Sequence, residues 1–501
     1  MNPKYIVVQA GGKGTRMKHL TLNKPKALVP IDNLPMLFHL FRKYPDSKYV
    51  IIGDYKHDVL ERYLAAFAEV EYTTVCAEGS SGTCSGVRKA MDKLPEKESF
   101  MLIWSDLILP EDFTFPEDTG DYIGIAKDFP CRWKYENNVF AEERSDTFGV
   151  AGLFVFHDKT ALTNVPEEGE LVRWLSGIGL TFKSLPLHRV KEYGLLSEYE
   201  KLETARCRPF NRTYIEDGCF VKEPVDNQGR DLAKRETAWY RRVQDQHFTN
   251  IPNILSYEPL KMEFIGGKAI YEYNHLKYDE KVKLLRQIID CLKSVQALEK
   301  TPSDFDSFNV AYIDKTFQRL EKVRNLVPFA GDEYVTINGR KCRNVFFCRE
   351  ELERRISKYF PAEFRLIHGD CTFSNMMLRE DGTPVLLDPR GYFGTTELYG
   401  DPAYDWSKLY YSIVGNYDQF NRKQFLLEIE EDKVELKISS NGWEFLESEF
   451  FHILDGEVTP EQVKLIHAII WLSLTTYAWE DYDSICGAFY NGLYYLEEVL
   501  K

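Results

Sequence analysis

The chain has 501 residues, of which 44% are hydrophobic and 28% charged, and its formal net charge at pH 7 is −15. One hydrophobic core rarely organises a chain of this length, so we expect two domains. The acidic balance and the absence of a long Lys/Arg cluster argue against a nucleic-acid partner, which would need a basic face.

The ten cysteines are scattered without a CxxC pair, which predicts neither a zinc site nor a disulfide framework. Residues 1–10 lack the regions of a signal peptide. The apolar stretch at residues 465–479 contains His467 and several hydroxyl side chains, so it predicts a buried helix rather than a membrane span. We therefore expect a cytoplasmic protein without membrane insertion.

In the first 200 residues, short apolar runs alternate with amphipathic segments. The runs at residues 5–8, 49–52 and 100–104 are typical of buried parallel strands. Their alternation with helical patterns predicts an α/β sandwich with helices on both faces of the sheet.

A glycine-rich loop, GGKGTR at residues 11–16, directly follows the first predicted strand. Its glycines allow backbone N–H groups to approach phosphates closely. The loop is neither a Walker A motif nor a full dinucleotide fingerprint, and alone it indicates little more than a tight turn. The segment NKPKALVP at residues 23–30 adds a fixed cation near it, Lys26.

This pair of motifs resembles the sugar-phosphate nucleotidyltransferase superfamily, whose signature is GxGTR followed by PKA, over roughly the first 200 residues. The resemblance implies a Rossmann-like fold, with Lys26 holding the phosphate of the second substrate. It also implies that the following residues hold the nucleoside triphosphate: Gly11, Gly12, Gly14, Thr15 and Arg16.

The same resemblance implies a base- and sugar-facing loop and a metal site. Gly82 and Thr83 stand where the family's loop belongs. Asp106 follows the strand at residues 100–104 and matches the family's metal-binding aspartate. The second metal carboxylate would be Glu192, where the family usually has an aspartate. Because the attacking phosphate is already ionised, we expect catalysis by alignment and by charge neutralisation from Mg²⁺, Arg16 and Lys26.

The pattern breaks between residues 196 and 212, which predicts domains at residues 1–205 and 206–501. Beyond the break we expect strands at residues 214–222, 260–265 and 268–273 and a helix containing Glu236 and Trp239. From Asp279 onward helical patterns dominate. A small mixed lobe at about 206–275 and a larger lobe at about 276–501 form the outline of a kinase.

The stretch LIHGDCTFSNMM at residues 366–377 and the later VLLDPR at 385–390 place three polar residues at kinase spacing. Asp370 would accept the proton of a hydroxyl substrate, while Asn375 and Asp388 would hold Mg²⁺ on the phosphates. We expect His368 to orient this loop rather than to transfer a proton.

This second stretch resembles the aminoglycoside phosphotransferase and choline kinase superfamily, from about residue 207 to residue 501. The resemblance implies a bilobal, protein-kinase-like α+β fold, with Asp401 and Asp405 bracing the catalytic loop. It further implies nucleotide-binding roles for a lysine, its helix partner and a hinge that meets the adenine: Lys222, Glu236, Glu263 and Ile265.

A kinase makes a phosphate ester and a nucleotidyltransferase consumes one, so we expect phosphorylation first. The donors would be ATP or another nucleoside triphosphate for the kinase and CTP, UTP or GTP for the transferase, with Mg²⁺ at both sites. The partners would be small molecules and nucleotides, and the oligomeric state stays open.

Three hypotheses remain for the function, and the first two differ in the substrate. The first is a sugar phosphorylated at its anomeric hydroxyl, for surface or capsule polysaccharide. It rests on the Gly82–Thr83 loop and on the segment at residues 388–402, which resembles kinase domains of capsule biosynthesis proteins. The second is choline or another amino alcohol, with a cytidine diphosphate product. The third makes one half a silent binding or scaffold module. The retention of Asp370, Asn375 and Asp388 in one half, and of Arg16, Lys26 and Asp106 in the other, opposes it.

Overall fold

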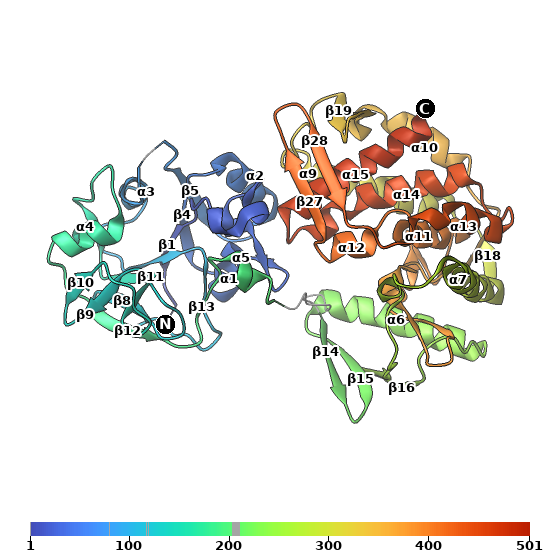
Figure 1. The fold of residues 1–501 in the computed structure, drawn as a ribbon, viewed down its shortest axis with the longest axis horizontal. Helices are drawn as coiled ribbons and strands as arrows, with labels where there is room; N and C mark the ends of the chain where they lie inside the picture. Colours follow the sequence, from blue (N-terminus) through green and yellow to red (C-terminus); the bar gives the residue numbers. More distant parts are fainter. Residues whose placement is uncertain (1, 80, 117, 119, 203–210) are drawn as a thin grey trace. The chain divides into compact units, whose positions relative to one another are not determined.

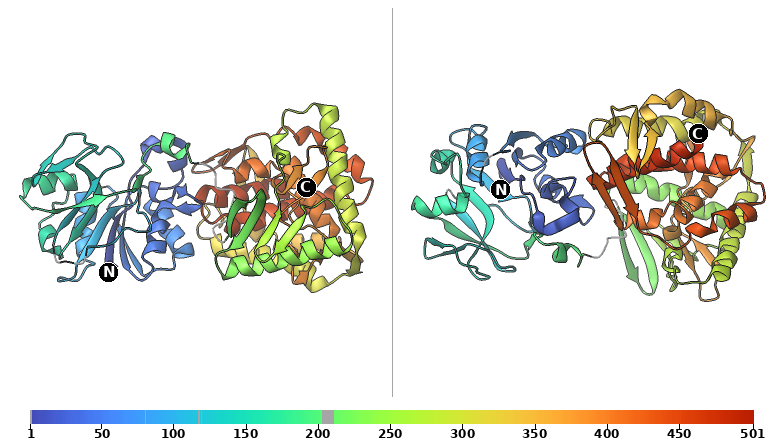
Figure 2. Two further views of the ribbon diagram at one scale, coloured as in Figure 1. Left: turned by 90° about the horizontal axis from the view of Figure 1, so that it is seen from below. Right: turned by 45° about the horizontal axis from the view of Figure 1, so that its top comes forward.

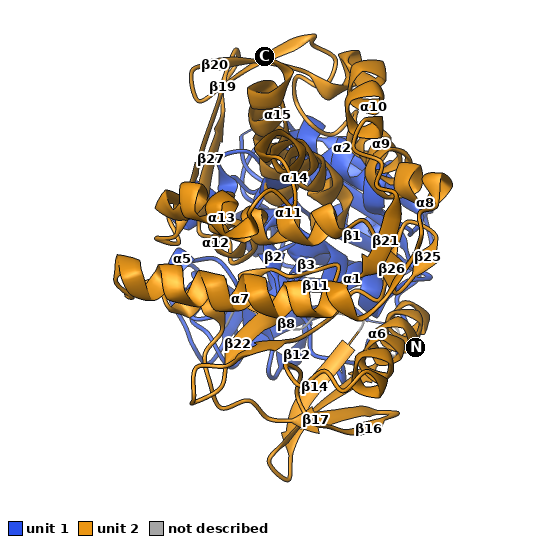
Figure 3. Cartoon of the chain, turned by 90° about the vertical axis from the view of Figure 1, so that its right-hand side faces the viewer, with its two compact units in different colours: residues 1–204, 480–483 blue, residues 205–479, 484–501 orange. Residues whose placement is uncertain are grey.

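The computed structural model describes residues 2–79, 81–116, 118, 120–202 and 211–501, and the chain forms two compact units. Unit 1 comprises residues 1–204 and 480–483, and unit 2 comprises residues 205–479 and 484–501, as coloured in Figure 3. The predicted boundary between residues 205 and 206 lies outside the described residues.

Within the described residues, unit 1 is built on a nine-stranded sheet whose main path runs β10-β9-β11-β6-β1-β4-β5, with β8 beside β11 and β12 beside β8. Its strands are β1 (Tyr5–Gln9), β4 (Lys48–Gly53), β5 (Tyr72–Cys76), β6 (Phe100–Trp104), β8 (Tyr122–Ala126), β9 (Lys134–Glu136), β10 (Val139–Ala141), β11 (Gly149–Phe156) and β12 (Lys183–Leu187). Strands β6, β1, β4 and β5 run parallel, as predicted, whereas β11 is antiparallel to β6.

Helices cover both faces of this parallel core. Ile6, Val7 and Val8 are consecutive and all fully buried, which requires cover on each face because side chains alternate along a strand. The helices are α1 (Met36–Lys43), α2 (His57–Phe67), α3 (Cys84–Met91), α4 (Leu171–Gly177) and α5 (Leu196–Tyr199). Residues of α3 and α4 share one apolar cluster with the strands, and Figure 1 shows α1 and α2 on the other side. The predicted α/β sandwich is confirmed.

Unit 2 begins with a small antiparallel sheet in the order β14-β15-β17-β16, packed against helix α6 (Asn227–Asp245). The strands are β14 (Asn211–Glu216), β15 (Cys219–Pro224), β16 (Ile254–Tyr257) and β17 (Leu260–Glu263). In Figure 2 these elements appear in green beside the orange and red helices of the same unit.

Two strand predictions in this lobe are wrong. Residues 214–222 do not form one strand, because Asp217 and Gly218 both have positive φ (51° and 74°) and turn the chain into the hairpin β14–β15. Residues 268–273 contain a short 3₁₀ helix, Ile270–Glu272, instead of a strand. The Glu272 carboxylate accepts the backbone N–H of Ala269 at 3.1 Å, which caps this turn.

The rest of unit 2 is mostly helical, with short strands that flank the segments predicted to be catalytic. Its helices are α7 (Tyr278–Leu298), α8 (Phe305–Asn309), α9 (Lys315–Val323), α10 (Arg349–Ser357), α11 (Pro402–Ile413), α12 (Tyr417–Asn421), α13 (Glu447–Leu454), α14 (Pro460–Leu474) and α15 (Tyr482–Leu500). Its strands are β18 (Lys300–Pro302), β19 (Tyr334–Ile337), β20 (Arg340–Arg343), β21 (Glu363–Leu366), β22 (Met376–Leu378), β23 (Pro384–Leu386), β24 (Tyr392–Phe393), β25 (Thr396–Glu397), β26 (Tyr399–Gly400), β27 (Phe425–Ile429) and β28 (Val434–Ile438).

The apolar stretch at residues 465–479 lies in α14 and the 3₁₀ turn that follows it, Thr475–Ala478. Most of α14 is buried against α9 and α11, which explains its apolar sequence. No helix among the described residues combines the length and the apolar character needed to cross a membrane.

Two candidate active sites

The glycine loop of unit 1 runs from the end of β1 into the 3₁₀ turn Thr15–Thr21. Gly11 must be a glycine, because a Cβ there would lie 2.6 Å from Cβ of Asp54. Gly14 adopts the left-handed conformation (φ +61°) that favours glycine. A Cβ on Gly12, in contrast, would meet no protein atom within 4 Å. The loop therefore presents open backbone at Gly12.

Beside this loop lies a cavity of about 230 Å³ at the carboxyl ends of β1, β4 and β5. Its lining residues are Gln9, Gly11, Gly12, Lys13, Ile52, Asp54, Ala77, Gly82, Thr83 and Gly86. The structure thus brings together the predicted Gly11, Gly12, Gly82 and Thr83. Gly82 (φ +88°) packs so tightly that a Cβ would lie 2.3 Å from the carbonyl oxygen of Gly169.

Two polar residues of the cavity are not among the predicted site residues. Gln9 is the last residue of β1, and its Nε2 donates to the carbonyl oxygen of Thr83 at 3.1 Å. Asp54 directly follows β4. Burial raises the pKa of Asp54, with a further contribution from Glu78. The signal that would have found both is their position at strand ends, where open α/β sheets bind ligands.

The charged residues predicted for nucleotidyl transfer converge at a second place in unit 1. Lys26 forms an ion pair with Asp106, and both side chains are largely buried. Glu192 lies on strand β13 (Lys191–Glu192), opposite β7 (Leu107–Ile108) and next to Asp106 in the fold. A Cβ on Gly194 would lie 2.1 Å from Glu192 Oε1 and 3.0 Å from Arg16 Nη2, so these two side chains approach one another there.

This cluster suits a divalent cation. Burial raises the pKa of Glu192, and the neighbouring Asp106 charge raises it further, while Lys26 and Arg16 oppose the shift. A cation would relieve this repulsion between the carboxylates. No group of three or more His, Cys, Asp or Glu side chains among the described residues is arranged to hold a metal. The two carboxylates would therefore share an ion with oxygens of the substrates or of water.

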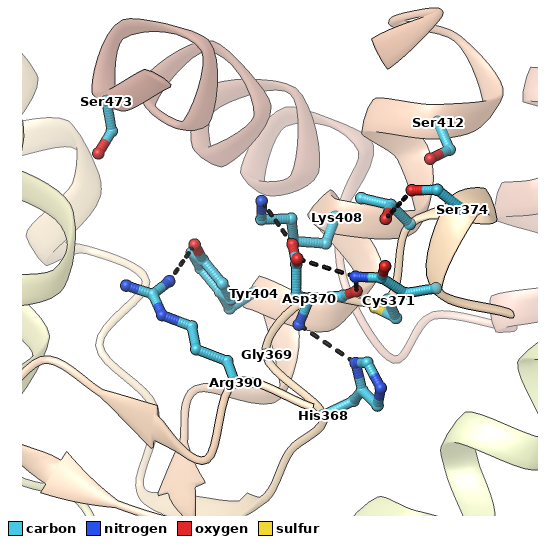
Figure 4. A network of polar contacts seen from close by, with 12 residues as sticks. His368, Gly369, Asp370, Cys371, Ser374, Arg390, Tyr404, Lys408, Ser412 and Ser473 are labelled. Atoms are coloured by element: carbon cyan, nitrogen blue, oxygen red, sulfur yellow. Dashed lines mark hydrogen bonds and ion pairs between the residues drawn. The ribbon is translucent and has the colours of Figure 1, made fainter. Parts of the chain in front are cut away.

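In unit 2, the carboxylate of Asp370 is held from two sides, as Figure 4 shows. Lys408 Nζ lies 2.9 Å from Oδ1, and the Asn375 amide donates to Oδ2 at 2.9 Å. Burial is the largest influence and acts to raise the pKa of Asp370, but the charge and hydrogen bond of Lys408, together with His368 and Arg390, outweigh it and hold the pKa below its ordinary value. The carboxylate is thus ionised and able to accept a proton at neutral pH.

His368 and Asp405 fix the loop that carries Asp370. His368 Nδ1 accepts the backbone N–H of Asp370 at 3.2 Å, and Nε2 lies 2.9 Å from the carbonyl oxygen of Leu387. Because burial also lowers the pKa of His368, the ring is neutral with its proton on Nε2. Asp405 accepts the backbone N–H groups of His368 at 3.0 Å and Gly369 at 2.7 Å. His368 is therefore a positioning residue.

Lys222 of β15 bridges two carboxylates. Its Nζ lies 2.8 Å from Glu236 of α6 and 2.7 Å from Asp388. Burial raises the pKa of Glu236 to about 7, an effect that Lys222 opposes and Asp388 reinforces. Asp388 has a positive φ (51°) and follows β23, and half of its side chain is exposed. Its carboxylate therefore stays accessible beside the lysine.

Asp388 and Asn375 also fit a divalent cation. The backbone N–H of Leu387 donates to the carbonyl oxygen of Asn375 at 2.9 Å, which ties the two segments together. The Asn375 amide nitrogen is engaged by Asp370, and no described residue donates a hydrogen bond to its Oδ1. An amide oxygen and a carboxylate are both suitable ligands for Mg²⁺.

The predicted hinge residues have other contacts as well. The Glu263 carboxylate accepts from Arg379 Nη2 at 3.0 Å and from the backbone N–H of Asn253 at 3.0 Å. Its side chain is therefore engaged within the protein, so any nucleotide contact there would have to involve backbone. Ile265 is buried. The hinge role of Glu263 and Ile265 stays a prediction.

Comparisons with known proteins agree with this arrangement. Residues 6–114 match the MobA-like NTP transferase domain, and residues 220–455 match the phosphotransferase enzyme family. Over 166 residues the chain is 33% identical to the UTP–glucose-1-phosphate uridylyltransferase AglF of Haloferax volcanii, covering 32% of this chain and 65% of AglF. It is 27% identical over 179 residues to the bifunctional protein GlmU of Methanococcus maripaludis, covering 35% of this chain and 38% of GlmU.

The chain thus spans between about a third and two thirds of the length of these relatives. Among solved structures, HddC from Yersinia pseudotuberculosis is 18% identical, with a TM-score of 0.34, and covers 39% of this chain and 96% of that one. The family resemblances inferred from the motifs are confirmed. The chain joins a domain of the MobA-like NTP transferase type to a domain of the phosphotransferase enzyme family, two enzyme types in one polypeptide.

Proposed function

We propose that the chain phosphorylates a small hydroxyl compound and then transfers a nucleotidyl group onto the resulting phosphate ester. The single observation that carries this proposal is the ionised Asp370, held by Lys408 and Asn375. It provides a base for a hydroxyl acceptor. The separate Lys26–Asp106 centre, which lies in the other unit, would serve the second reaction.

In the kinase step, Asp370 takes the proton of the acceptor hydroxyl. The hydroxyl oxygen forms a bond to the γ-phosphorus of ATP or another nucleoside triphosphate, and the bond to the bridging oxygen breaks to release the diphosphate. Lys222 would leave Asp388 and pair with the donor phosphates, with Glu236 keeping it in place. Mg²⁺, held by Asn375 and Asp388, would neutralise phosphate charge when bound.

In the transfer step, an oxygen of the phosphate ester attacks the α-phosphorus of CTP, UTP or GTP, and pyrophosphate leaves. No base is needed, because the ester is already ionised at neutral pH. The loop at residues 11–16, together with Gly82 and Thr83, would bind the nucleotide, and Arg16 and Lys26 would position the reacting phosphates. Mg²⁺ at Asp106 and Glu192 would supply further charge neutralisation.

For the substrate we propose a sugar phosphorylated at its anomeric hydroxyl, as a precursor of surface polysaccharide. The similarity of unit 1 to a glucose-1-phosphate uridylyltransferase supports this choice. Both steps consume nucleoside triphosphates, which makes the cytoplasm the expected compartment.

The test is a mass-spectrometric assay of sugars, choline and other alcohols with ATP, CTP, UTP and GTP. Wild type should give both the phosphate ester and the nucleotide-linked product. Asp370→Asn should stop ester formation yet still use a supplied ester, and Asp106→Asn should accumulate the ester. The two-step proposal is refuted if either substitution stops both reactions in folded protein. A cytidine diphosphate product formed from choline would show that the substrate is choline instead of a sugar.

A further inference from the structure

Four basic side chains gather around one tyrosine of unit 2, close to the proposed base. They come from three elements: Arg235 from α6, Lys315 and Arg319 from α9, and Arg390 from the segment after β23. The Cζ atoms of Arg235 and Arg390 lie 4.6 Å and 4.3 Å from the ring centroid of Tyr392, and Lys315 Nζ lies 5.3 Å from it. We call these four residues the cation cluster.

Two of the three guanidinium groups of the cluster are fixed by neutral partners. Arg390 donates to the hydroxyl oxygens of Tyr404 at 2.7 Å and Tyr392 at 3.2 Å. Arg319 donates to the Ser473 hydroxyl at 3.1 Å and to the carbonyl oxygen of the same residue. Arg319 and Arg390 are therefore positioned without using an acidic side chain.

Among the described residues the cluster forms no ion pair, and the carboxylate that attracts Arg390 is the proposed base Asp370. No described carboxylate lies within 4.0 Å of a charged nitrogen of the cluster, whereas the nearby Lys408 and Lys222 both have carboxylate partners. Burial lowers the pKa of Lys315 to about 5, and repulsion from Arg390, Arg319, Lys408 and Arg235 adds to the shift, so this amine is uncharged at neutral pH until an anion binds beside it. Burial and Arg390 also lower the pKa of Arg319. Buried like charges are costly, so this arrangement indicates a site for an anion.

The cluster adjoins the base. A Cβ on Gly369, the residue before Asp370, would lie 2.9 Å from Cβ of Arg390, and the backbone N–H of Arg390 donates to the carbonyl oxygen of His368 at 2.9 Å. Figure 4 shows Arg390 and Tyr404 on one side of Asp370. Lys222, paired with Asp388, already provides the cation proposed for the donor phosphates. The cluster is therefore available to bind the acceptor substrate.

We propose that the phosphotransferase domain acts on a hydroxyl compound bearing a second, anionic group, a carboxylate or a phosphate, which Arg319, Arg390 and Lys315 bind. Guanidinium groups match the planar geometry of such anions. The anionic group stays unchanged while the hydroxyl oxygen is phosphorylated. This inference rests on the proposed kinase activity and narrows its substrate class. A quaternary ammonium acceptor such as choline would be repelled by the cluster.

The first experiment compares acceptors that differ in charge, measuring ADP release with ATP and Mg²⁺. The sets are glucose, glucuronate and glucose 6-phosphate; glycerol, glycerate and glycerol 3-phosphate; and choline. Within a set, we expect kcat/KM for an anionic member to exceed that of the neutral one by about tenfold or more. The carboxylate and phosphate members tell the two anion sources apart. A preference for choline or for the neutral members would overturn the proposal.

The second experiment uses Arg319→Met, with Arg324→Met as the matched control near the end of the same helix, where the side chain is partly exposed and pairs with Glu321. Arg319→Met should raise the acceptor KM by about tenfold or more and leave the ATP KM unchanged, while the control changes neither. A rise in the ATP KM instead would assign the cluster to the nucleotide and overturn the proposal.

If no acceptor in the panel is phosphorylated, the anion site is tested by the stabilisation of the protein against heat by inorganic phosphate. At matched ionic strength, phosphate should raise the Tm of wild type and of Arg324→Met above the value in chloride, and Arg319→Met should lose this gain. Equal gains in all three proteins would refute the anion site. Anion binding without any phosphorylation would refute the kinase proposal alone, whereas efficient phosphorylation of choline would refute the anionic acceptor alone.

Discussion

Lys408 Nζ lies 2.9 Å from Oδ1 of Asp370, and this ion pair opposes the effect of burial on the carboxylate. The lysine lies on α11, so the proposed base is positioned by this helix as well as by its own loop. Asn375 completes the arrangement by donating to the other carboxylate oxygen. Asp370 therefore has both a defined charge and a defined orientation.

Lys408→Met should lower kcat of phosphorylation by about 10- to 100-fold, because the base loses the partner that keeps it ionised and aligned. Lys408→Arg retains the charge and should keep most of the activity. Steady-state ADP release measures both, and the ATP KM should stay within about twofold of wild type, since Lys408 is not placed at the donor phosphates. An unchanged kcat for Lys408→Met would remove the ion pair from the mechanism.

Asp405→Asn should weaken the loop without touching a substrate. Asp405 is fully buried and accepts the N–H groups of His368 and Gly369 with separate oxygens, and an amide offers one acceptor oxygen instead of two. We expect the unfolding free energy of unit 2 to fall by about 1–3 kcal/mol and kinase turnover to fall with it. Denaturant unfolding and ADP release measure these effects. Nucleotidyl transfer onto a supplied ester serves as the internal control and should not change.

The spacing of residues was enough to predict which polar side chains of unit 2 lie together when they are close in the sequence. Asp370, Asn375 and Asp388 stand on one loop and the hairpin that follows it, so the motif carries their geometry. Lys408 and the cation cluster escaped prediction because their contacts arise from the packing of separate helices, for which no fixed spacing exists. The same holds for Asp54, which lines the cavity of unit 1 because β4 lies beside β1 in the sheet.

The two wrong strand predictions have local causes. The segment from Tyr214 to Lys222 was predicted as one strand, but Asp217 and Gly218 favour a left-handed turn that divides it into two strands. The sheet and helix layers of unit 1 were easier to predict, because parallel strands buried on both faces leave long apolar runs such as the one at residues 100–104. Local turn chemistry therefore decided where the prediction failed.

Gly12→Ala should separate ligand binding from folding in unit 1. A Cβ at this position meets no protein atom within 4 Å, so the thermal unfolding of the variant should match wild type. If nucleotide phosphates approach the backbone here, the added methyl group should raise the nucleotide KM of the transferase by about tenfold or more. Gly11→Ala is the contrasting variant, because its Cβ would collide with Asp54 and lower stability. A normal KM for folded Gly12→Ala would place the nucleotide elsewhere.

His467 gives unit 2 a specific sensitivity to acid. The ring is fully buried on α14, and its Nε2 accepts the indole N–H of Trp471 at 2.9 Å. Burial, with a smaller contribution from Lys464, lowers the pKa of His467 to about 3, against an ordinary value of about 6.5. The folded protein therefore keeps the ring neutral, whereas the unfolded chain protonates it as the pH falls below about 6.5. The stability that this residue contributes is complete above that pH and is lost progressively between about 6.5 and 3.

His467→Gln removes this titration and leaves an amide oxygen that can accept the Trp471 N–H. Urea unfolding of unit 2 at pH 7.5, 6.0 and 5.0 should show wild type losing about 1–2 kcal/mol more than the variant across this range, at about 1.4 kcal/mol for each pH unit below 6.5. His275→Gln is the matched control, because His275 is exposed and should leave the pH dependence of wild type intact. Parallel curves for wild type and His467→Gln would show that the buried ring is not the source of the acid sensitivity.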